Sequence, residues 1–421
     1  MKIKILNTSQ ANFNKRLSDH LSFKQGNYNS VEKTVDKILK KIVESGDSGL
    51  RLLIKKYDNT FYKKISNSIV TKKEISDAYS VTPKKVVSNL KKAMRNIKTF
   101  SKQQKLKSWS IKVKGSKLGE KVTPINSVGI YVPGGKASYP STVLMNAIPA
   151  QVAGVRDITM VCPPVAGKLN PFVLIAADLC DVNKIYKFGG AHAIAALAFG
   201  TETIKPVDKI VGPGNIYVAT AKKKVYGSVG IDSFAGPSEV LIIADQNASA
   251  ELVAIDMFAQ AEHDELAQAI VISTSQSALD NVLRTIERKI KGEQRSGIIE
   301  QALRDRGALI KVRDLNEALK VVNLLSPEHL QLSILNASEF AKGVENAGAV
   351  FVGARTTEAV GDYTAGPSHV LPTNGTARFS SPLGVYDFQT RTSVIECSKE
   401  GSRSLNEAAS IIALEEGLFS H

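Results

Sequence analysis

The sequence is poor in cysteine. Only Cys162, Cys180 and Cys397 occur among its 421 residues, and they lie far apart with no CxxC pair. Disulfide frameworks and thiolate metal cages need paired or closely spaced cysteines, so neither is the basis of this fold. A few isolated cysteines are typical of a protein that folds in a reducing cytoplasm.

Long apolar runs are missing as well. No segment approaches the roughly 18 consecutive apolar residues of a membrane-spanning helix. The opening stretch "MKIKILNTSQ" has no apolar run behind its lysines. The sequence therefore predicts a soluble, cytoplasmic protein that is not exported and has no membrane partner.

Acidic residues are too few to balance the basic ones, since 40 Asp and Glu stand against 55 Lys and Arg, for a net charge of +15. Much of the lysine lies before residue 125, in stretches such as "TPKKVVSNLKKAM", and would suit a polyanion-binding face. Apolar residues recur between these lysines at helical spacing, and no zinc-finger spacing, RNP-like motif or arginine cluster accompanies them. We interpret the lysines as the solvated faces of amphipathic helices and expect no nucleic-acid partner.

What the sequence does contain is a regular alternation of short apolar runs and helix-like segments. The first runs are "SVGIYV", "DITMVCPP", "KIYKFGG", "DKIVGPGN" and "SEVLIIAD", with helical patterns near 141–154, 170–181, 190–199 and 215–226. A second set follows with "AIVIST", "GALIKV" and "GAVFVG", separated by helical patterns near 276–291, 314–325 and 336–346. Such alternation predicts two α/β units, each a parallel sheet with helices on its faces.

The predicted domains follow from this pattern. The lysine-rich segment before residue 125 has too few strands for a third sheet, and we expect it to pack onto the second unit. The boundaries are an N-terminal arm (1–26), a discontinuous α/β domain that carries most of the site (27–130 plus 239–384), a second and incomplete α/β domain (131–238), and a helical C-terminal extension (385–421).

Parallel α/β sheets bind ligands in the loops at the carboxyl ends of their strands, and these loops are rich in glycine and proline here. "YVPGGKASYPST", "GGAHAIAALAFGTET" and "VGPGNIYVATAKKK" each lead from a strand into a helix. Glycine lets the backbone approach a ligand closely, and a helix N-terminus favours phosphate. None is a GxGxxG motif, so each taken singly could be no more than a turn.

Histidine is scarce but unevenly placed. Apart from His20, each of the six histidines falls in or beside a Gly/Pro-rich or acidic stretch, as His192, His263, His329, His369 and His421 do. Gln260 and His263 are three residues apart in a helical stretch and would share one face. Together with Asp362 they offer nitrogen and oxygen ligands that suit a divalent ion, zinc first, although this spacing alone is equally compatible with structural roles.

Glu328 and His329 follow Pro327 at the start of "HLQLSI", which alternates as a strand does but could equally open a helix. A carboxylate next to an imidazole supplies two proton-transfer groups with different intrinsic pKa values. The plainer alternative is a solvated glutamate beside a partly buried histidine.

Taken together, the assembled stretches resemble the histidinol dehydrogenase family, in order and over nearly the whole chain. They are "VGIYVPGG", "PSTVLMNAIPAQVAGV", "GGAHAIAALAFGTET", "DKIVGPGNIYVATAK", "IDSFAGPSEVLIIAD", "AQAEH", "LSPEHL", "GDYTAGPSHVLPT" and "LGVYDFQTRTSV". The resemblance implies an enzyme with one Zn²⁺ per subunit that oxidises L-histidinol to L-histidine through L-histidinaldehyde with two NAD+, the last two steps of histidine biosynthesis. It further implies an intertwined homodimer whose subunits hold two Rossmann-like parallel-sheet units with helical N- and C-terminal extensions.

Residue roles carry over from the same motifs. Glu328 and His329 occupy the catalytic positions. The implied zinc ligands are Gln260, His263, Asp362 and His421, the last reaching the site of the partner subunit. The substrate-contacting positions are Ser238, Gln260, His263, His329, Asp362, His369, Glu416 and His421, and those for the dinucleotide are Tyr131, His192 and Asn215.

Two features depart from the family pattern. His192 stands where the family usually has glutamine, and the sequence stops at His421, where family members usually continue for about another turn, so we expect that either could weaken the site. Two other readings therefore stay open: a catalytically impaired metal-binding homologue, and a dehydrogenase of a related amino alcohol.

Overall fold

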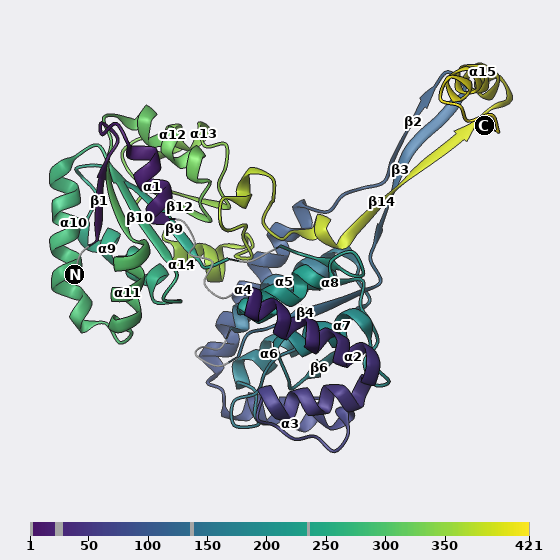
Figure 1. Ribbon diagram of the computed structural model, residues 1–421, viewed down its shortest axis with the longest axis horizontal. Helices are drawn as coiled ribbons and strands as arrows, with labels where there is room; N and C mark the ends of the chain where they lie inside the picture. The colour runs from purple at the N-terminus through teal and green to yellow at the C-terminus, as the bar shows by residue number, and fades with distance from the viewer. Residues whose placement is uncertain (1–2, 22–27, 135–138, 234–235, 421) are drawn as a thin grey trace.

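The computed structural model describes residues 3–21, 28–134, 139–233 and 236–420. These residues form two parallel sheets in the body of the molecule and an antiparallel sheet that projects from it (Figure 1). Within the described ranges, no helix combines the length and apolar character that a membrane span requires.

The first α/β unit is a five-stranded parallel sheet in the order β6-β5-β4-β7-β8. Its strands are β4 (Ser127–Tyr131), β5 (Asp157–Val161), β6 (Lys184–Tyr186), β7 (Lys209–Val211) and β8 (Gly230–Ile231). Its helices are α5 (Pro140–Ala153), α6 (Pro171–Leu179), α7 (Gly190–Phe199) and α8 (Ile216–Val225). Helices α5 and α6 share one hydrophobic cluster with the sheet, and α7 and α8 share the other, so both faces are covered.

Three N-terminal helices form an outer layer on this first unit: α2 (Tyr28–Tyr57), α3 (Lys72–Val81) and α4 (Lys84–Gln103). Helix α2 packs on α7 and α8, α3 packs on α6, and α4 packs on α5. The prediction that 27–130 joins 239–384 is wrong for these helices and for β4. The physical reason lies in α5, α6 and α7, which are apolar nearly all round and need cover on the side that faces away from the sheet.

The second α/β unit is a six-stranded sheet in the order β1-β11-β10-β9-β12-β13, with every neighbouring pair parallel. Its strands are β1 (Lys4–Asn7), β9 (Glu239–Ala244), β10 (Gln268–Ser273), β11 (Ala308–Lys311), β12 (His329–Ser333) and β13 (Ala349–Val352). Its helices are α1 (Phe13–Leu21), α9 (Ala250–Ala261), α10 (Gln276–Lys289), α11 (Ser296–Arg306), α12 (Leu315–Leu325) and α13 (Ala337–Lys342). Residues 4–21 of the predicted arm are thus an edge strand and a helix of this unit, and "HLQLSI" is a strand.

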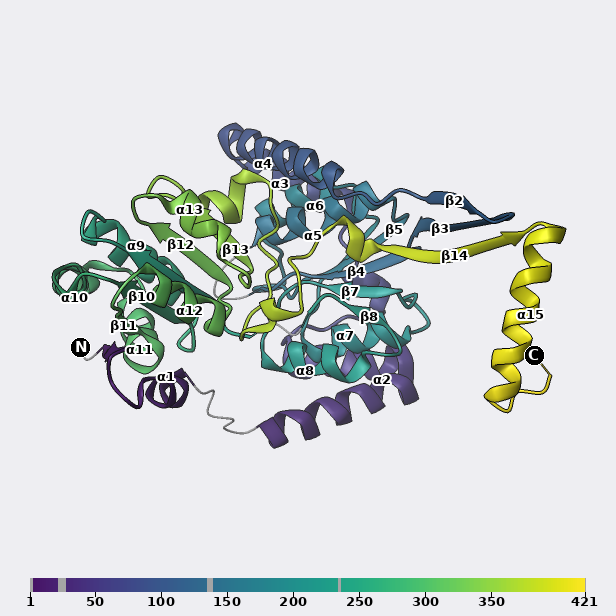
Figure 2. The same ribbon diagram turned by 90° about the horizontal axis from the view of Figure 1, so that it is seen from above.

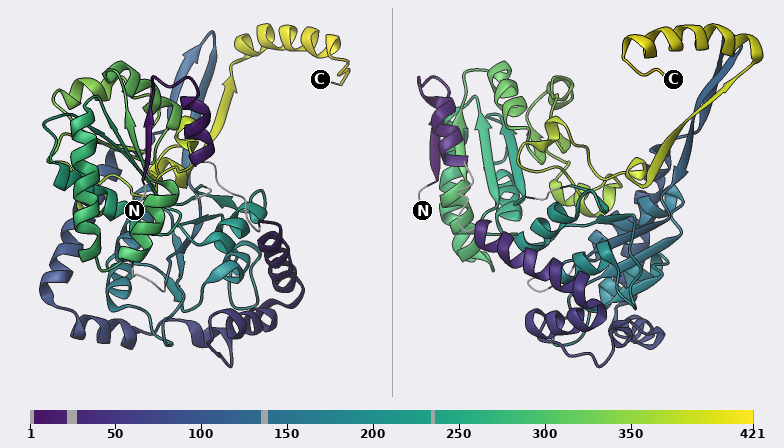
Figure 3. Two further views of the ribbon diagram at one scale, coloured as in Figure 1. Left: turned by 60° about the vertical axis from the view of Figure 1, so that its left-hand side comes forward. Right: turned by 45° about the vertical axis from the view of Figure 1, so that its right-hand side comes forward.

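The third sheet is antiparallel and forms a projecting arm, in the order β14-β3-β2. It consists of β2 (Trp109–Val113), β3 (Ser116–Pro124) and β14 (Gln389–Cys397), and it carries helix α15 (Lys399–Glu415) at its tip (Figures 2 and 3). The C-terminal extension was predicted to be helical, and β14 corrects that prediction. Nearly every residue of β2 and β14 is exposed. Strand β2 alternates apolar and polar residues, as "WSIKV" shows, whereas "QTRTSVIEC" of β14 lacks the alternation by which sequence reasoning detects a strand.

A buried ion pair holds the turn after β7, which lines the cleft described below. Lys222 of α8 pairs with Asp232, and each side chain is 3% exposed. The ammonium of Lys222 donates to the Gly212 carbonyl at 2.9 Å, and Asp232 accepts from the Gly212 N–H at 2.7 Å. Gly212 has φ +108°, and an added Cβ would lie 2.1 Å from the Tyr131 carbonyl oxygen, so glycine is required at this turn.

Replacing Asp232 with asparagine should leave the Lys222 ammonium buried without its counter-charge. We expect the free energy of unfolding to fall by about 3–5 kcal/mol, the usual result of removing one partner of a buried pair. Chemical denaturation would measure this. The control is Glu339→Gln in the Lys342–Glu339 pair, whose side chains are 73% and 74% exposed, and whose loss should cost less than about 1 kcal/mol. Equal effects of the two substitutions would contradict the argument.

Candidate active site

A cavity of about 1260 Å³ lies between the two α/β units and is lined by both. From the first unit come the turn after β7, with Asn215, and the segment that begins α5, with Tyr139 and Ser141. These groups lie beyond the carboxyl ends of β7 and β4, where ligands were expected.

The second unit presents the opposite edge of its sheet. Ser238 precedes β9, and Glu328 precedes β12, which begins at His329, so the groups that line the cavity lie at the amino ends of these strands. Ligand-binding loops were expected at the carboxyl ends of the strands, and this unit differs, whereas Glu328 and His329 were placed correctly at the start of "HLQLSI". The two sheets meet with the carboxyl edge of one facing the amino edge of the other.

The cavity brings together most of the residues singled out from the sequence. Those that line it are Asn215, Ser238, Gln260, His263, Glu328, His329, Asp362 and His369. Tyr131 and His192 do not line it. Glu416 directly follows α15 at the tip of the arm, and His421 lies outside the described residues.

The peptide groups of one residue, Glu239, hold both proposed catalytic side chains. Its N–H donates to Glu328 Oε2 at 2.8 Å, and its carbonyl oxygen lies 3.0 Å from His329 Nδ1. A carbonyl only accepts, so Nδ1 carries the proton of that bond. In the neutral ring the lone pair is then on Nε2, which lies 3.5 Å from Asp362 Oδ1. This arrangement leaves Nε2 available to accept a proton from a ligand.

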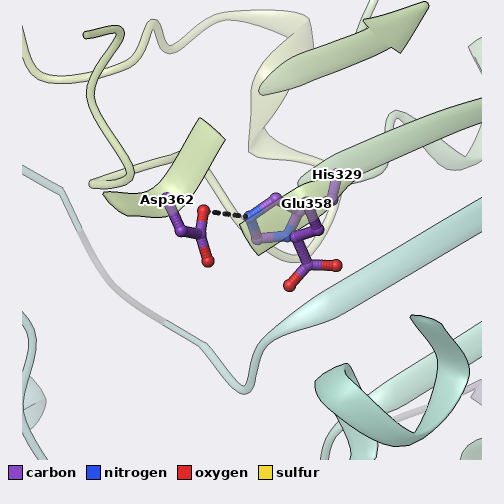
Figure 4. A group of neighbouring side chains, drawn as sticks. All are labelled: His329, Glu358 and Asp362. Carbon is purple, nitrogen blue, oxygen red and sulfur yellow. Dashed lines mark ion pairs between the residues drawn. The ribbon is translucent and has the colours of Figure 1, made fainter. Parts of the chain in front are cut away.

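Two carboxylates approach His329 from a short helical segment (Figure 4). Glu358 belongs to α14 (Glu358–Val360), and Asp362 belongs to the π-helical turn that follows it (Gly361–Ala365). One ligand atom from each of Glu358, Asp362 and His329 can be chosen so that all lie within 4.8 Å of one another. A spacing of four residues places the two carboxylates on one face of the segment.

Sequence reasoning missed Glu358, which is only 5% exposed. The available signal was its spacing of four residues from Asp362 in "TEAVGD", a pair of carboxylates on one helical face. Gln260 and His263 also differ in detail from the prediction, because α9 ends at Ala261 and His263 lies in the turn after it. Both residues nevertheless line the same cavity.

Burial shifts the pKa of Glu328, whereas neighbouring charges dominate the shift at His329. Burial raises the pKa of Glu328 to about 8, against the opposing charge of His329 and the hydrogen bond from Glu239. Burial alone would lower the pKa of His329, but the charges of Glu358, Glu328 and Asp362 outweigh it and raise that pKa well above its usual value.

The surrounding groups have a composition that fits a divalent cation. Burial lowers the pKa values of His263 and His369, which favours the neutral imidazole that a metal requires. Burial tends to raise the pKa of Asp362, but the hydrogen bond and charge of His329 lower it overall. In the described part of the chain neither Asp362 nor Glu358 is paired with lysine or arginine, and the cationic partner beside them is His329, whose Nε2 lies 3.5 Å from Asp362 Oδ1. Burial raises the pKa of Glu358 to about 7, against the charge of His329.

The predicted dinucleotide residues Tyr131 and His192 meet at the turn that starts α7. His192 is 1% exposed, and its Nε2 lies 3.0 Å from Asp58 Oδ2. The Gly189 N–H donates to the same carboxylate oxygen at 3.1 Å, and the Gly190 N–H donates to the Tyr131 hydroxyl at 3.1 Å. Tyr131 therefore contacts the backbone of the glycine turn through its hydroxyl. His192 is linked to the turn through the Asp58 carboxylate, which accepts from Gly189.

With this geometry in place, comparison with known proteins identifies the family. The family model described as histidinol dehydrogenase matches residues 22–421. The chain belongs to the histidinol dehydrogenase family. It is therefore an oxidoreductase by family, and the resemblance inferred from the sequence motifs is confirmed.

Individual relatives agree over their full length. Histidinol dehydrogenase of Neisseria gonorrhoeae is 50% identical over 420 residues, which cover 100% of this chain and 98% of the relative. That of Nitrosomonas europaea is 47% identical over 422 residues, with coverage of 100% and 98%. The crystal structure of histidinol dehydrogenase from Elizabethkingia anophelis matches with a TM-score of 0.94 and 34% identity, covering 100% of this chain and 96% of that one.

The raised pKa of Glu328 predicts a pH-dependent stability in the metal-free protein. Between pH 4.5 and about 8, Glu328 is protonated in the folded chain and ionised in the unfolded chain. Unfolding therefore releases protons in this window, and the free energy of unfolding falls as the pH rises. Glu328→Gln removes this contribution, so we expect the variant to gain thermal stability relative to the parent chain as the pH rises from 5 to 9.

Thermal melts in the presence of a chelator would test this. The exposed Glu287→Gln serves as the matched control and should melt in parallel with the parent chain at every pH. Parallel curves for Glu328→Gln as well would mean that Glu328 is ionised throughout.

Proposed function

We propose that the chain oxidises L-histidinol to L-histidine through L-histidinaldehyde, with two molecules of NAD+ and one zinc ion per subunit, as the last two steps of histidine biosynthesis. The single observation that carries the proposal is the pair Glu328 and His329, held by the two peptide groups of Glu239, with the carboxylates of Glu358 and Asp362 beside His329.

The metal would be held by Gln260, His263 and Asp362, with His421 as the fourth protein ligand. Zinc supplies a template that orients the imidazole and amine of histidinol as a chelate. Ser238 and His369 line the same cavity and are proposed to contact the substrate, as is Glu416. Such a chelate would place the carbinol carbon against the protein groups that move protons.

His329 is proposed to act first. Its Nε2 accepts the hydroxyl proton of histidinol while hydride leaves the carbinol carbon, which yields the aldehyde. NAD+ serves as the hydride acceptor when bound. A cation held by Asp362 would remove part of the negative field that raises the pKa of His329, which would favour the neutral ring that a base requires.

Glu328 is proposed to act in the second oxidation. As the carboxylate it takes a proton from water, the hydroxide adds to the aldehyde carbon, and the hydrate then loses a hydride to give the carboxylic acid. A pKa of about 8 places this group near its working range in neutral to mildly alkaline solution.

The dinucleotide is proposed to lie against the glycine-rich turns of the first unit, with Asn215 in the cavity wall and Tyr131 and His192 beneath the turn at Gly189. Asn215 caps α8, since its side chain accepts from the N–H groups of Tyr217 and Val218 at 3.1 and 3.2 Å. The His192–Asp58 contact also supports the second candidate, a metal-binding homologue with impaired cofactor binding, because His192 is buried and its Nε2 is engaged by Asp58.

We further propose an intertwined homodimer in which the arm of each subunit carries His421 to the cavity of its partner. The arm exposes large apolar side chains, among them Trp109 at 52%, Ile395 at 71% and Phe419 at 83%. An exposed apolar surface of this kind is typical of a contact between subunits. In each view the arm projects away from its own body (Figures 1, 2 and 3).

The purified protein should reduce two NAD+ for each limiting L-histidinol at mildly alkaline pH, and a chelator should abolish this activity. NADH absorbance measures the stoichiometry. His329→Gln should slow the first oxidation, whereas Glu328→Gln should slow oxidation of supplied histidinaldehyde more than that of histidinol. Zinc binding without NADH formation would favour the impaired homologue, and activity on another amino alcohol alone would favour the related dehydrogenase.

Subunit mixing tests the ligand donated in trans. His421→Ala and Gln260→Ala homodimers should each lack zinc and activity. When they are unfolded and refolded together, hybrid dimers should contain one intact site, with roughly a quarter of the parent activity for random pairing. No recovery in the mixture, although each variant folds and dimerises, would overturn donation in trans.

A further inference from the structure

Glu358 is a buried carboxylate in the cavity to which the family resemblance gives no role. It is 5% exposed and lies beside Gln260, which is 1% exposed. The side-chain amide of Gln260 faces both oxygens of Glu358. With its nitrogen directed at Glu358, the amide donates to the two oxygens at 2.6 and 3.0 Å.

Chemistry decides which way this amide points. An amide has one donor end and one acceptor end, and with its oxygen directed at Glu358 that oxygen faces only acceptors while the nitrogen faces only donors. The opposite orientation would set the amide oxygen against two carboxylate oxygens in a buried site, where an unmade hydrogen bond is costly. Glu358 therefore selects the orientation with nitrogen toward itself.

This orientation matters because zinc binds the oxygen of an amide and not its nitrogen. If the nitrogen of Gln260 is held by Glu358, the oxygen is directed away from Glu358. We propose that Glu358 is a positioning residue that fixes the amide of Gln260 so that its oxygen is presented to the metal. This inference rests on the proposed zinc site and deepens it.

A second reading of the same cluster has Glu358 as a direct ligand, since one of its oxygens belongs to the group that lies within 4.8 Å with His329 and Asp362. The contacts of Glu358 favour the positioning role, because both of its oxygens already accept from Gln260. Groups that orient metal ligands in this way typically contribute about 10–100-fold to metal affinity.

A double-mutant cycle distinguishes the two readings. Zinc affinity would be measured by competition with a chelator of known affinity, and bound zinc by elemental analysis, for the parent chain, Glu358→Gln, Gln260→Ala and the double variant. A positioning role predicts that Glu358→Gln weakens zinc binding about 10–100-fold in the parent chain. It also predicts less than about a threefold further loss in the Gln260→Ala background, because the two residues act as one unit.

Equal losses in both backgrounds would overturn the proposal in favour of direct ligation, and no loss in the parent background would overturn it outright. Glu345→Gln, at an exposed site, is the matched control and should bind zinc as the parent does. If Glu358→Gln does not fold, Glu358→Asp keeps the charge but shortens the reach, and the same cycle applies. A parent chain that binds no zinc would refute the metal site itself, an outcome distinct from failure of the positioning role alone.

Discussion

The parallel pairing of β9 with β12 is the constraint on which the site depends. It places His329 opposite Val240, and this register brings the peptide groups of Glu239 to the side chains of Glu328 and His329. Both faces of β9 are buried, since Val240 and Ile242 pack in one apolar cluster and Leu241 and Ile243 in the other. A one-residue shift of register would exchange the two sets of side chains between clusters packed for different shapes. The register that packs the core is therefore also the register that positions Glu328 and His329.

Both α/β units and the segment with Asp362 position the residues that line the cavity. The first unit contributes a turn locked by the buried Lys222–Asp232 pair, and the second contributes strand ends from the centre of its sheet. The segment with Asp362 touches both units, since Asn96 of α4 donates to the carbonyl oxygen of Thr364 at 2.7 Å. Helix α4 thus links the outer layer of the first unit to the carboxylate cluster of the second.

The fold was predictable where periodicity and burial coincide. Each apolar run singled out after residue 127 is a strand, from "SVGIYV" at β4 to "GAVFVG" at β13. The placement of α2–α4 was not predictable in the same way, because an amphipathic stripe shows that a helix packs but not on which unit. The apolar character of α5–α7 on all sides was the missed signal, since it calls for a second layer. Strand β14 left no signal, because both of its faces are exposed.

The sequence motifs predicted most of the residues that line the cavity, but they did not predict which of these side chains contact one another. The cavity unites three stretches that lie far apart in sequence: Gln260 with His263, Glu328 with His329, and Asp362. Glu358 escaped notice because a single glutamate in a helical stretch resembles any solvated residue until its burial is known. The contact of His192 with Asp58 depends on the end of α2 meeting the start of α7, a long-range contact that no local pattern encodes.

The projecting arm has a consequence for the order in which the chain acquires its structure. Its central strand β3 pairs with β14, and Thr123 and Thr390 in that pairing are 267 positions apart. Domains begin to fold during synthesis, N-terminal parts first. The β2–β3 hairpin therefore emerges from the ribosome with one edge open and waits for nearly the whole remaining chain before β14 closes it. An unpaired strand edge is a template for wrong association, and charged residues, lysine above all, disfavour it. Strand β3 carries two such exposed residues, Lys117 and Lys121.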